Sequence, residues 1–216
     1  ARELLRKPGP APELALVGAQ RMVFVGTGLY LGTSDVPGAT GANAFSSQTQ
    51  SMYGLKDVLT TALPTPLRTS LQQQTLTTTT TTRTTTNNAV DYAVQNGWYI
   101  DFPTTGERVN TDPTIALGAL IFTTNIPSGV VCQPGGSSWE YFINLKTGGL
   151  VDYSTVGYSG VFLGNALASR PVLIQLPNGK VVSLVRTSDA KTIAKEVPVA
   201  PPGAGARRIS WRELFK

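Results

Sequence analysis

Residues 21–32, RMVFVGTGLYLG, run an apolar β-like stretch directly into Gly-Thr-Gly. A dinucleotide-binding fingerprint needs a third glycine three residues after the second, at the start of a helix that receives the pyrophosphate. That position is Leu31, and the turn-forming sequence after it has no helical apolar period. The segment therefore predicts a strand that ends in a sharp turn, with Gly26, Thr27 and Gly28 as structural turn residues.

The composition favours strands over helices. Only 14% of the 216 residues are charged and 41% are hydrophobic, while Thr, Gly and Pro are abundant. This balance suits short strands joined by turns better than helices with solvated charged faces. We expect an all-β protein, long enough for one sizeable core or two small ones.

The net charge of +5 does not indicate nucleic-acid binding. Seven of the eighteen basic residues lie within residues 1–7 and 207–216, and residues 8–206 hold eleven basic and eleven acidic side chains. A neutral body lacks the dense basic face that phosphate binding requires. We expect solvated basic ends and no nucleic-acid partner.

The residue types exclude several kinds of catalysis. The sequence has no histidine, which removes the usual general base, the Ser-His and Cys-His pairs and most zinc or copper sites. Its single cysteine, Cys132, lacks an activating neighbour. We interpret Cys132 as a small buried residue or a half-cystine paired outside this chain, in preference to a reactive nucleophile.

The sequence predicts no membrane span. The longest apolar run, residues 115–122, is far shorter than the ~20 residues of a membrane helix. The chain begins at Ala1 without an initiator Met or a signal peptide, so we expect a processed or excised piece of a longer protein.

Three segments predict strands. In SWEYFINLKTGG, residues 138–149, apolar and polar positions alternate, which is typical of a half-buried antiparallel strand. In PVLIQLPNGKVVSLVR, two aliphatic runs flank Asn178 and Gly179, a strong hairpin signal. The Thr-rich run of residues 75–86 could be a glycosylated stalk, but the propensity of Thr favours a strand or a strand plus loop.

A weak internal repeat links two parts of the chain. MVFVGTG is followed by QSMYGLKD, and ALIFTTN is followed by WEYFINLKTG, so each copy pairs an apolar strand with an aromatic strand that ends in a turn. This pattern is typical of β-propeller blades. We expect a further strand set between the copies, with GWYIDF as a candidate, and two to three blades in all.

The acidic and aromatic residues indicate structural roles in preference to catalysis or ligand binding. Asp101, Glu107 and Asp112 are too widely spaced for a calcium loop, so we interpret them as turn and surface residues. Sequence spacing does not exclude a carboxylate pair for glycoside hydrolysis, but nothing singles one out. Four aromatic residues could stack on a sugar, although core packing is the commoner role of such residues. They are Trp98, Tyr99, Trp139 and Tyr141.

The expected organisation has four parts. Residues 1–12 form a charged, Pro-rich lead, residues 13–196 the strand-rich body, residues 197–205 a Pro/Gly linker, and residues 206–216 a C-terminal anchoring segment. The last segment contains RRISWREL, which is either a basic docking strand or an apolar anchor on the body. The candidate docking residues are Arg207, Arg208, Trp211 and Arg212.

Six motifs follow one another along the chain: VFVGTGLYLG, QSMYGLKD, GWYIDFPTTGERV, LIFTTNIPSG, CQPGGSSWEYFINLKTG and RRISWREL. Together they resemble the C-terminal domain of the PilY/PilC family of type IV pilus tip-associated proteins. The resemblance covers residues 15–149 and 207–214 and is weaker over residues 150–205. It implies the C-terminal blades of an irregular quinoprotein-like β-propeller, in which Gly26, Thr27 and Gly28 end an inner strand.

The resemblance also implies a function. Such proteins are secreted, act with minor pilins in pilus assembly and extension, and serve as adhesins toward host or surface receptors, without catalysis. The family's calcium loop is absent from this sequence, so no residue here is assigned to calcium and we expect the loop upstream, together with an N-terminal adhesive domain. A quinoprotein-type dehydrogenase and a carbohydrate-binding propeller are the alternatives. Three segments are candidate contact loops: residues 33–48, 103–113 and 125–137.

Overall fold

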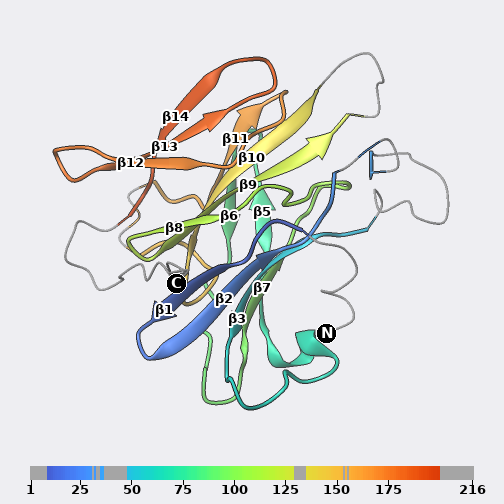
Figure 1. The fold of residues 1–216 in the computed structure, drawn as a ribbon, viewed down its shortest axis with the longest axis vertical. Helices are drawn as coiled ribbons and strands as arrows, with labels where there is room; N and C mark the ends of the chain where they lie inside the picture. Colours follow the sequence, from blue (N-terminus) through green and yellow to red (C-terminus); the bar gives the residue numbers. More distant parts are fainter. Residues whose placement is uncertain are drawn as a thin grey trace, which may run out of the picture.

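The computed structural model describes residues 9–30, 32, 35–36, 48–128, 135–152, 154 and 156–199. Strands dominate this part of the chain and form three sheets, none of which closes into a barrel (Figure 1). The prediction of an all-β fold is confirmed. Whether the sheets are propeller blades stays a prediction.

The first sheet has the strand order β1-β2-β3-β7-β4. Its first four strands pair antiparallel, and β4 pairs with β7 in parallel. GWYIDF does not belong to a separate strand set, because it forms β7 beside β3. The residues between the two repeat copies instead divide between the first and second sheets. The strands are β1 (Glu13–Val17), β2 (Gln20–Gly26), β3 (Ser51–Lys56), β7 (Gly97–Asp101) and β4 (Gln72–Gln74).

The second sheet has the order β5-β6-β11-β10-β9-β8, and all its neighbours are antiparallel. The Thr-rich run forms the hairpin β5–β6, in which the Thr79 amide donates to the Thr82 carbonyl at 2.8 Å. The strand prediction for this run is therefore confirmed. The strands are β5 (Leu76–Thr78), β6 (Thr82–Thr85), β11 (Gly160–Gly164), β10 (Gly136–Asn144), β9 (Ala119–Pro127) and β8 (Thr114–Ala116).

The third sheet is an antiparallel meander of β12 (Val172–Gln175), β13 (Val181–Arg186) and β14 (Thr192–Glu196). Its first connection is a three-residue loop around Asn178. The Gly179 amide donates to the Leu176 carbonyl at 2.9 Å, and Gly179 has a φ of 82°. A turn followed by a left-handed glycine is a common way to close a three-residue hairpin loop.

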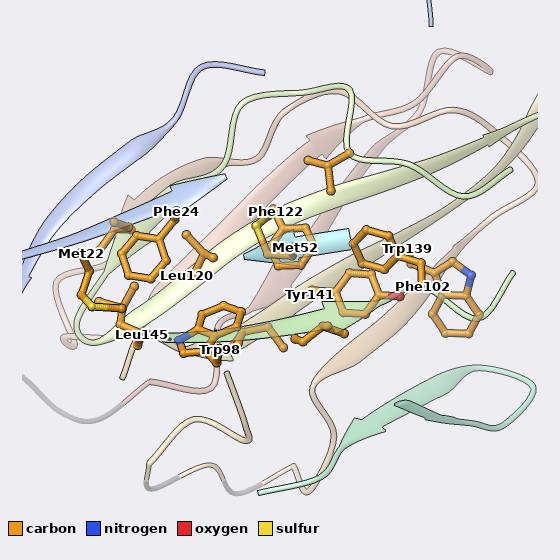
Figure 2. Close-up of a cluster of buried hydrophobic side chains, with 14 residues drawn as sticks. Met22, Phe24, Met52, Trp98, Phe102, Leu120, Phe122, Trp139, Tyr141 and Leu145 are labelled. Atoms are coloured by element: carbon orange, nitrogen blue, oxygen red, sulfur yellow. Dashed lines mark hydrogen bonds between the residues drawn. The ribbon is translucent and has the colours of Figure 1, made fainter. Parts of the chain in front are cut away.

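Two apolar clusters hold the sheets together. The first lies between the first and second sheets, where Trp98 is fully buried and the rings of Phe122 and Tyr141 stack with centroids 5.0 Å apart (Figure 2). The second lies between the second and third sheets and includes Phe142 and Val185. The second sheet is therefore the middle layer, covered on both faces.

The middle position corrects the prediction that SWEYFINLKTGG is a half-buried strand. Trp139 and Tyr141 face the first cluster, as the alternation predicts, but Phe142 belongs to the second cluster and Glu140 is 0% exposed. The reason is the third sheet, which covers the face of β10 that a polar residue would otherwise turn to solvent. Alternation along one strand does not report how many layers surround it.

The outer face of the first sheet is covered by the chain segment that follows β3. Tyr53 and Leu55 of β3 pack against Leu67 and Leu71, at the start and just past the end of the 3-10 helix η2 (Leu67–Ser70). This segment caps one end of the stack of sheets. The outer face of the third sheet has no such cover among the described residues, and Val172 there is 51% exposed.

Candidate functional site

The Gly-Thr-Gly turn, residues 26–28, is hydrogen-bonded to β3 on one side and to the loop of residues 103–113 on the other. β2 ends at Gly26, and the backbone amide of Thr27 then donates to the Ser51 carbonyl of β3 at 2.9 Å. The Ser51 amide donates in return to the Thr27 hydroxyl at 2.8 Å. On the other side, the Val109 amide donates to the Thr27 carbonyl at 3.0 Å. The turn joins β3 to the loop that contains Glu107.

The two glycines of this turn allow close approach of that loop. A Cβ atom on Gly26 would overlap the side chain of Val109, and one on Gly28 would overlap that of Arg108. Gly28 also has a φ of 123°, which side-chain-bearing residues rarely adopt. These glycines therefore allow the turn to pack closely on the loop that contains Arg108 and Val109.

A charged network lies buried between the sheets. Arg83 of β6 and Glu107 are 1% and 0% exposed, and Arg83 Nη1 donates to Glu107 Oε1 at 2.5 Å. The Tyr141 hydroxyl also donates to Glu107 Oε1 at 2.8 Å, and Thr124 Oγ1 does so at 2.7 Å. The same carboxylate oxygen thus connects the loop to β6, β9 and β10.

Aromatic rings complete the surroundings of Arg83. Its guanidinium carbon lies 3.9 Å from the ring centroid of Trp139, a cation–π contact. Burial lowers the pKa of Arg83, but Tyr141 and Glu107 outweigh this effect and raise the pKa above its usual value. Arg83 therefore stays charged, and Glu107 is the carboxylate that balances it.

These contacts correct the interpretation of Asp101 and Glu107 as turn and surface residues. Glu107 is a buried partner of Arg83, and Asp101 at the end of β7 accepts a hydrogen bond from Arg68 Nη1 at 2.9 Å. Both partners come from distant segments, so spacing along the sequence did not reveal them. Asp112 lies at the surface, as predicted, and its side chain is 43% exposed.

Arg68 of η2 lies at the centre of a second polar cluster, on the outer face of the first sheet. It donates to the Tyr53 hydroxyl at 2.7 Å and to Ser51 Oγ at 2.8 Å, and it stacks over the Tyr99 ring at 4.7 Å from the centroid. Its side chain is 32% exposed. The guanidinium donates four hydrogen bonds to side chains of β3 and β7, so the cluster ties the η2 segment to these two strands.

Glu140 is a buried carboxylate between the second and third sheets. One oxygen accepts a hydrogen bond from the Ser183 hydroxyl of β13, and the other has no partner among the described residues. Burial raises the pKa of Glu140 to about 7, against the lowering effect of the Ser183 hydrogen bond and of Lys195. The charge state of this group therefore affects how well the third sheet packs on the second.

The aromatic residues do not form an exposed platform. Trp98, Trp139 and Tyr141 are 0%, 5% and 0% exposed, which confirms the core interpretation for these three. Tyr99 is half-buried and stacks on Tyr53 with centroids 6.0 Å apart. Among the described residues, no three His, Cys, Asp or Glu side chains gather closely enough to hold a metal ion.

Several predicted residues lie outside the described part of the chain. These are Cys132 and the four candidate docking residues Arg207, Arg208, Trp211 and Arg212, together with most of residues 33–48. The loop of residues 103–113 is described and carries Glu107, whose role is internal. Within the described residues, no helix is long and apolar enough to cross a membrane.

A groove of about 510 Å³ opens where the edges of the three sheets meet. Its walls are β8 at the edge of the second sheet and β12 at the edge of the third, and it is also lined by Glu13, the first residue of β1, and by Ala11 just before it. Asp112 accepts a hydrogen bond from the Ala11 amide at 2.8 Å and lies 4.0 Å from Arg170. No pattern in the sequence predicts this groove, because its walls come from three distant segments.

Comparison with known proteins gives one partial similarity to report. The chain is 33% identical over 66 residues to a protein described as a type IV pilus biogenesis factor PilY1 homolog from Xylella fastidiosa strain Temecula1. The aligned part is 28% of this chain and 4% of that much longer protein. No protein-family model matches the chain, and no solved structure matches it.

The similarity agrees with the resemblance to the PilY/PilC family at a coarse level. A part of this chain is related in sequence to a part of a pilus biogenesis factor homolog. The chain spans only a small fraction of that relative. No particular residue of the described structure is assigned a role by the similarity.

Proposed function

We propose that this chain is a non-catalytic part of a type IV pilus biogenesis factor and pilus-tip adhesin. The observation that carries the proposal is the 33% identity to a PilY1 homolog over 66 residues. The proposed protein is secreted or held at the cell surface, at the pilus tip and in association with the outer membrane. There it supports pilus extension, twitching motility and attachment.

In this proposal the chain acts through protein contacts. Its partners are minor pilins and a host or surface receptor. The stacked sheets provide a rigid scaffold, and the proposed contacts are made by loops and strand edges on that scaffold. The buried Arg83 and Glu107 and the partly exposed Arg68 support this proposal, because each is bonded to other residues of the chain and has a structural role.

The genetic test removes this chain from its parent protein. The bacterium that encodes it is deleted for the parent gene, then complemented with the whole gene or with a version that lacks these 216 residues. Surface pili are counted by electron microscopy and twitching is scored on agar. An immunoblot against another part of the protein controls for secretion of the shortened version.

The proposal predicts that the deletion loses pili and twitching, that the whole gene restores both, and that the shortened gene restores neither. Unchanged piliation in the deletion strain would contradict a role in biogenesis. Full restoration by the shortened gene would contradict a role for this part of the protein.

A further inference from the structure

Two open strand edges face each other across the groove described above. β12 is an edge strand of the third sheet and β8 is an edge strand of the second, and both line the groove. Figure 1 shows β8 running beside β12 where the two sheets meet. Among the described residues, no strand pairs with the outer edge of either.

The register shows which backbone groups of β12 point into the groove. In an antiparallel pair, alternate residues turn both backbone groups toward the partner strand. The Leu176 amide donates to the Lys180 carbonyl at 2.8 Å, so Leu176 turns toward β13. The Val181 carbonyl accepts from the amide of Val197, just after β14, so Val181 turns toward β14 and away from its partner Gln175. The alternation then leaves the N–H and C=O groups of Leu173 and Gln175 turned away from β13, toward the groove.

The same reasoning applies to β8. Ala116 and Ala119 flank a two-residue turn in which Leu117 and Gly118 have φ values of 45° and 85°, so they form the hydrogen-bonded pair of the hairpin. Ile115 is the next residue, and its backbone groups therefore point away from β9. Ile115 lines the groove opposite β12.

The four residues of β12 lack the protection that edge strands usually carry, although Arg170 and Pro171 directly precede them. Lysine, proline or a bulge in an edge strand discourages pairing with another chain. The opposite edge of the same sheet, β14, carries Lys195 and Glu196. β12 has the sequence VLIQ, and Val172 and Ile174 on its outer face are 51% and 43% exposed.

We propose that this groove binds an extended peptide segment of a partner protein, which adds as a strand to β12. An extended backbone can pair with the free donors and acceptors of a strand edge through regular main-chain hydrogen bonds. The partner segment carries apolar side chains at alternate positions, where they cover Val172 and Ile174. Near Arg170, which is 67% exposed, it carries an acidic residue or a carboxylate.

This inference goes beyond the proposed function, because it rests on sheet geometry alone. A volume of about 510 Å³ is within the range of known ligand sites and is enough for a short extended segment. A peptide can therefore bind whether or not the parent protein acts in pilus assembly.

The test uses peptides selected for binding and a backbone-specific variant. A phage-displayed library of random peptides is selected on the immobilised full chain, and the strongest binder is synthesised and titrated against the purified chain. Gln175→Pro removes the N–H group that points into the groove without breaking a bond to β13. Ala194→Pro is the matched control, because the register turns the Ala194 N–H to the other, protected edge of the same sheet.

We expect the selected peptide to bind the unmodified chain and Ala194→Pro with equal affinity. Its affinity for Gln175→Pro should be lower by a factor of at least about ten. Bound peptide should also slow hydrogen exchange at the Leu173 and Gln175 amides. A peptide methylated at its pairing amides should lose binding, which keeps the test valid if Gln175→Pro fails to fold.

Three results would overturn the proposal. The library yields no binder, the binder protects amides elsewhere, or binding is unaffected by both Gln175→Pro and peptide methylation. If sedimentation shows instead that the chain dimerises, and Gln175→Pro abolishes the dimer, the occupant of the groove is a second copy of the chain and the peptide assignment is wrong.

Discussion

Arg83 and Glu107 lie 2.5 Å apart, from Nη1 to Oε1, although 24 residues separate them in the sequence and neither is more than 1% exposed. A buried ion pair of this kind adds little net stability, but the loss of one partner leaves an uncompensated charge. The pair also joins β6 to the loop that packs on the Gly-Thr-Gly turn. Substitution of either residue should therefore have a large effect on the stability of the folded chain.

Arg83→Met should destabilise the chain by about 3–5 kcal/mol, because it leaves the buried carboxyl group of Glu107 without its cationic partner. Denaturant unfolding measures the change. Lys180→Met is the control, because Lys180 forms an exposed pair with Glu196 at 2.9 Å and should cost less than about 1 kcal/mol. Combining Arg83→Met with Glu107→Leu should recover stability relative to Arg83→Met alone. Equal losses for Arg83→Met and Lys180→Met would contradict the burial of this charge pair.

Gly28→Ala should destabilise the chain by at least ~2 kcal/mol, because the new methyl group meets Arg108 and the backbone has a φ of 123°. Gly32→Ala is the matched control, since a Cβ there meets nothing within 4 Å. Thermal unfolding of both variants gives the comparison. A neutral Gly28→Ala would show that the turn does not pack on the loop of residues 106–109.

Stability should fall as the pH rises from about 4.5 to about 7. The pKa of Glu140 is about 7 in the folded chain and near 4.5 when exposed, so in this window the unfolded chain loses the proton first. The full effect is about 3 kcal/mol, absent at lower pH and complete above pH 7. Unfolding curves across this range measure it, and Glu140→Gln should flatten the profile. An unchanged profile in Glu140→Gln would assign the pH dependence to another group.

Asn125→Asp should cost about 2–4 kcal/mol near neutral pH. The Asn125 amide nitrogen donates to Asn110 Oδ1 at 2.8 Å and to the Ala168 carbonyl at 2.9 Å, and aspartate replaces this donor by a charged acceptor. Asn178→Asp is the control, because the exposed Asn178 only accepts a hydrogen bond, from the Lys180 amide. If both substitutions have the same small effect in denaturant unfolding, Asn125 does not link β9 to the start of the third sheet.

Local signals in the sequence were sufficient for the strands and for one hairpin. Asn178 and Gly179 lie in the loop between β12 and β13, and the alternation from Trp139 to Ile143 identified β10 and the face that meets the first cluster. These features depend on neighbours along the chain, which a sequence displays directly. The repeat likewise corresponds to two real strand pairs, β2–β3 and β9–β10.

Features that depend on distant partners could not be predicted. The sequence places Glu107 at the surface because its partner Arg83 lies 24 positions earlier, on β6. It predicts a half-buried strand around Glu140 because the third sheet that covers this strand follows later in the chain. A hint was present in each case. Arg83 and Glu140 are each the one charged residue of their strand. Such a residue is buried when layers of structure cover both faces of the strand, and it then needs a hydrogen-bonding partner.

Direct binding of the purified chain to the minor pilins of the bacterium that encodes it tests most directly whether the chain acts through protein contacts in pilus assembly. Each pilin ectodomain is titrated onto the immobilised chain, with heat-denatured chain as the control. The proposed function predicts saturable binding of at least one minor pilin to the folded chain. No binding of any minor pilin, by a chain that unfolds cooperatively and is therefore folded at the start, would contradict it.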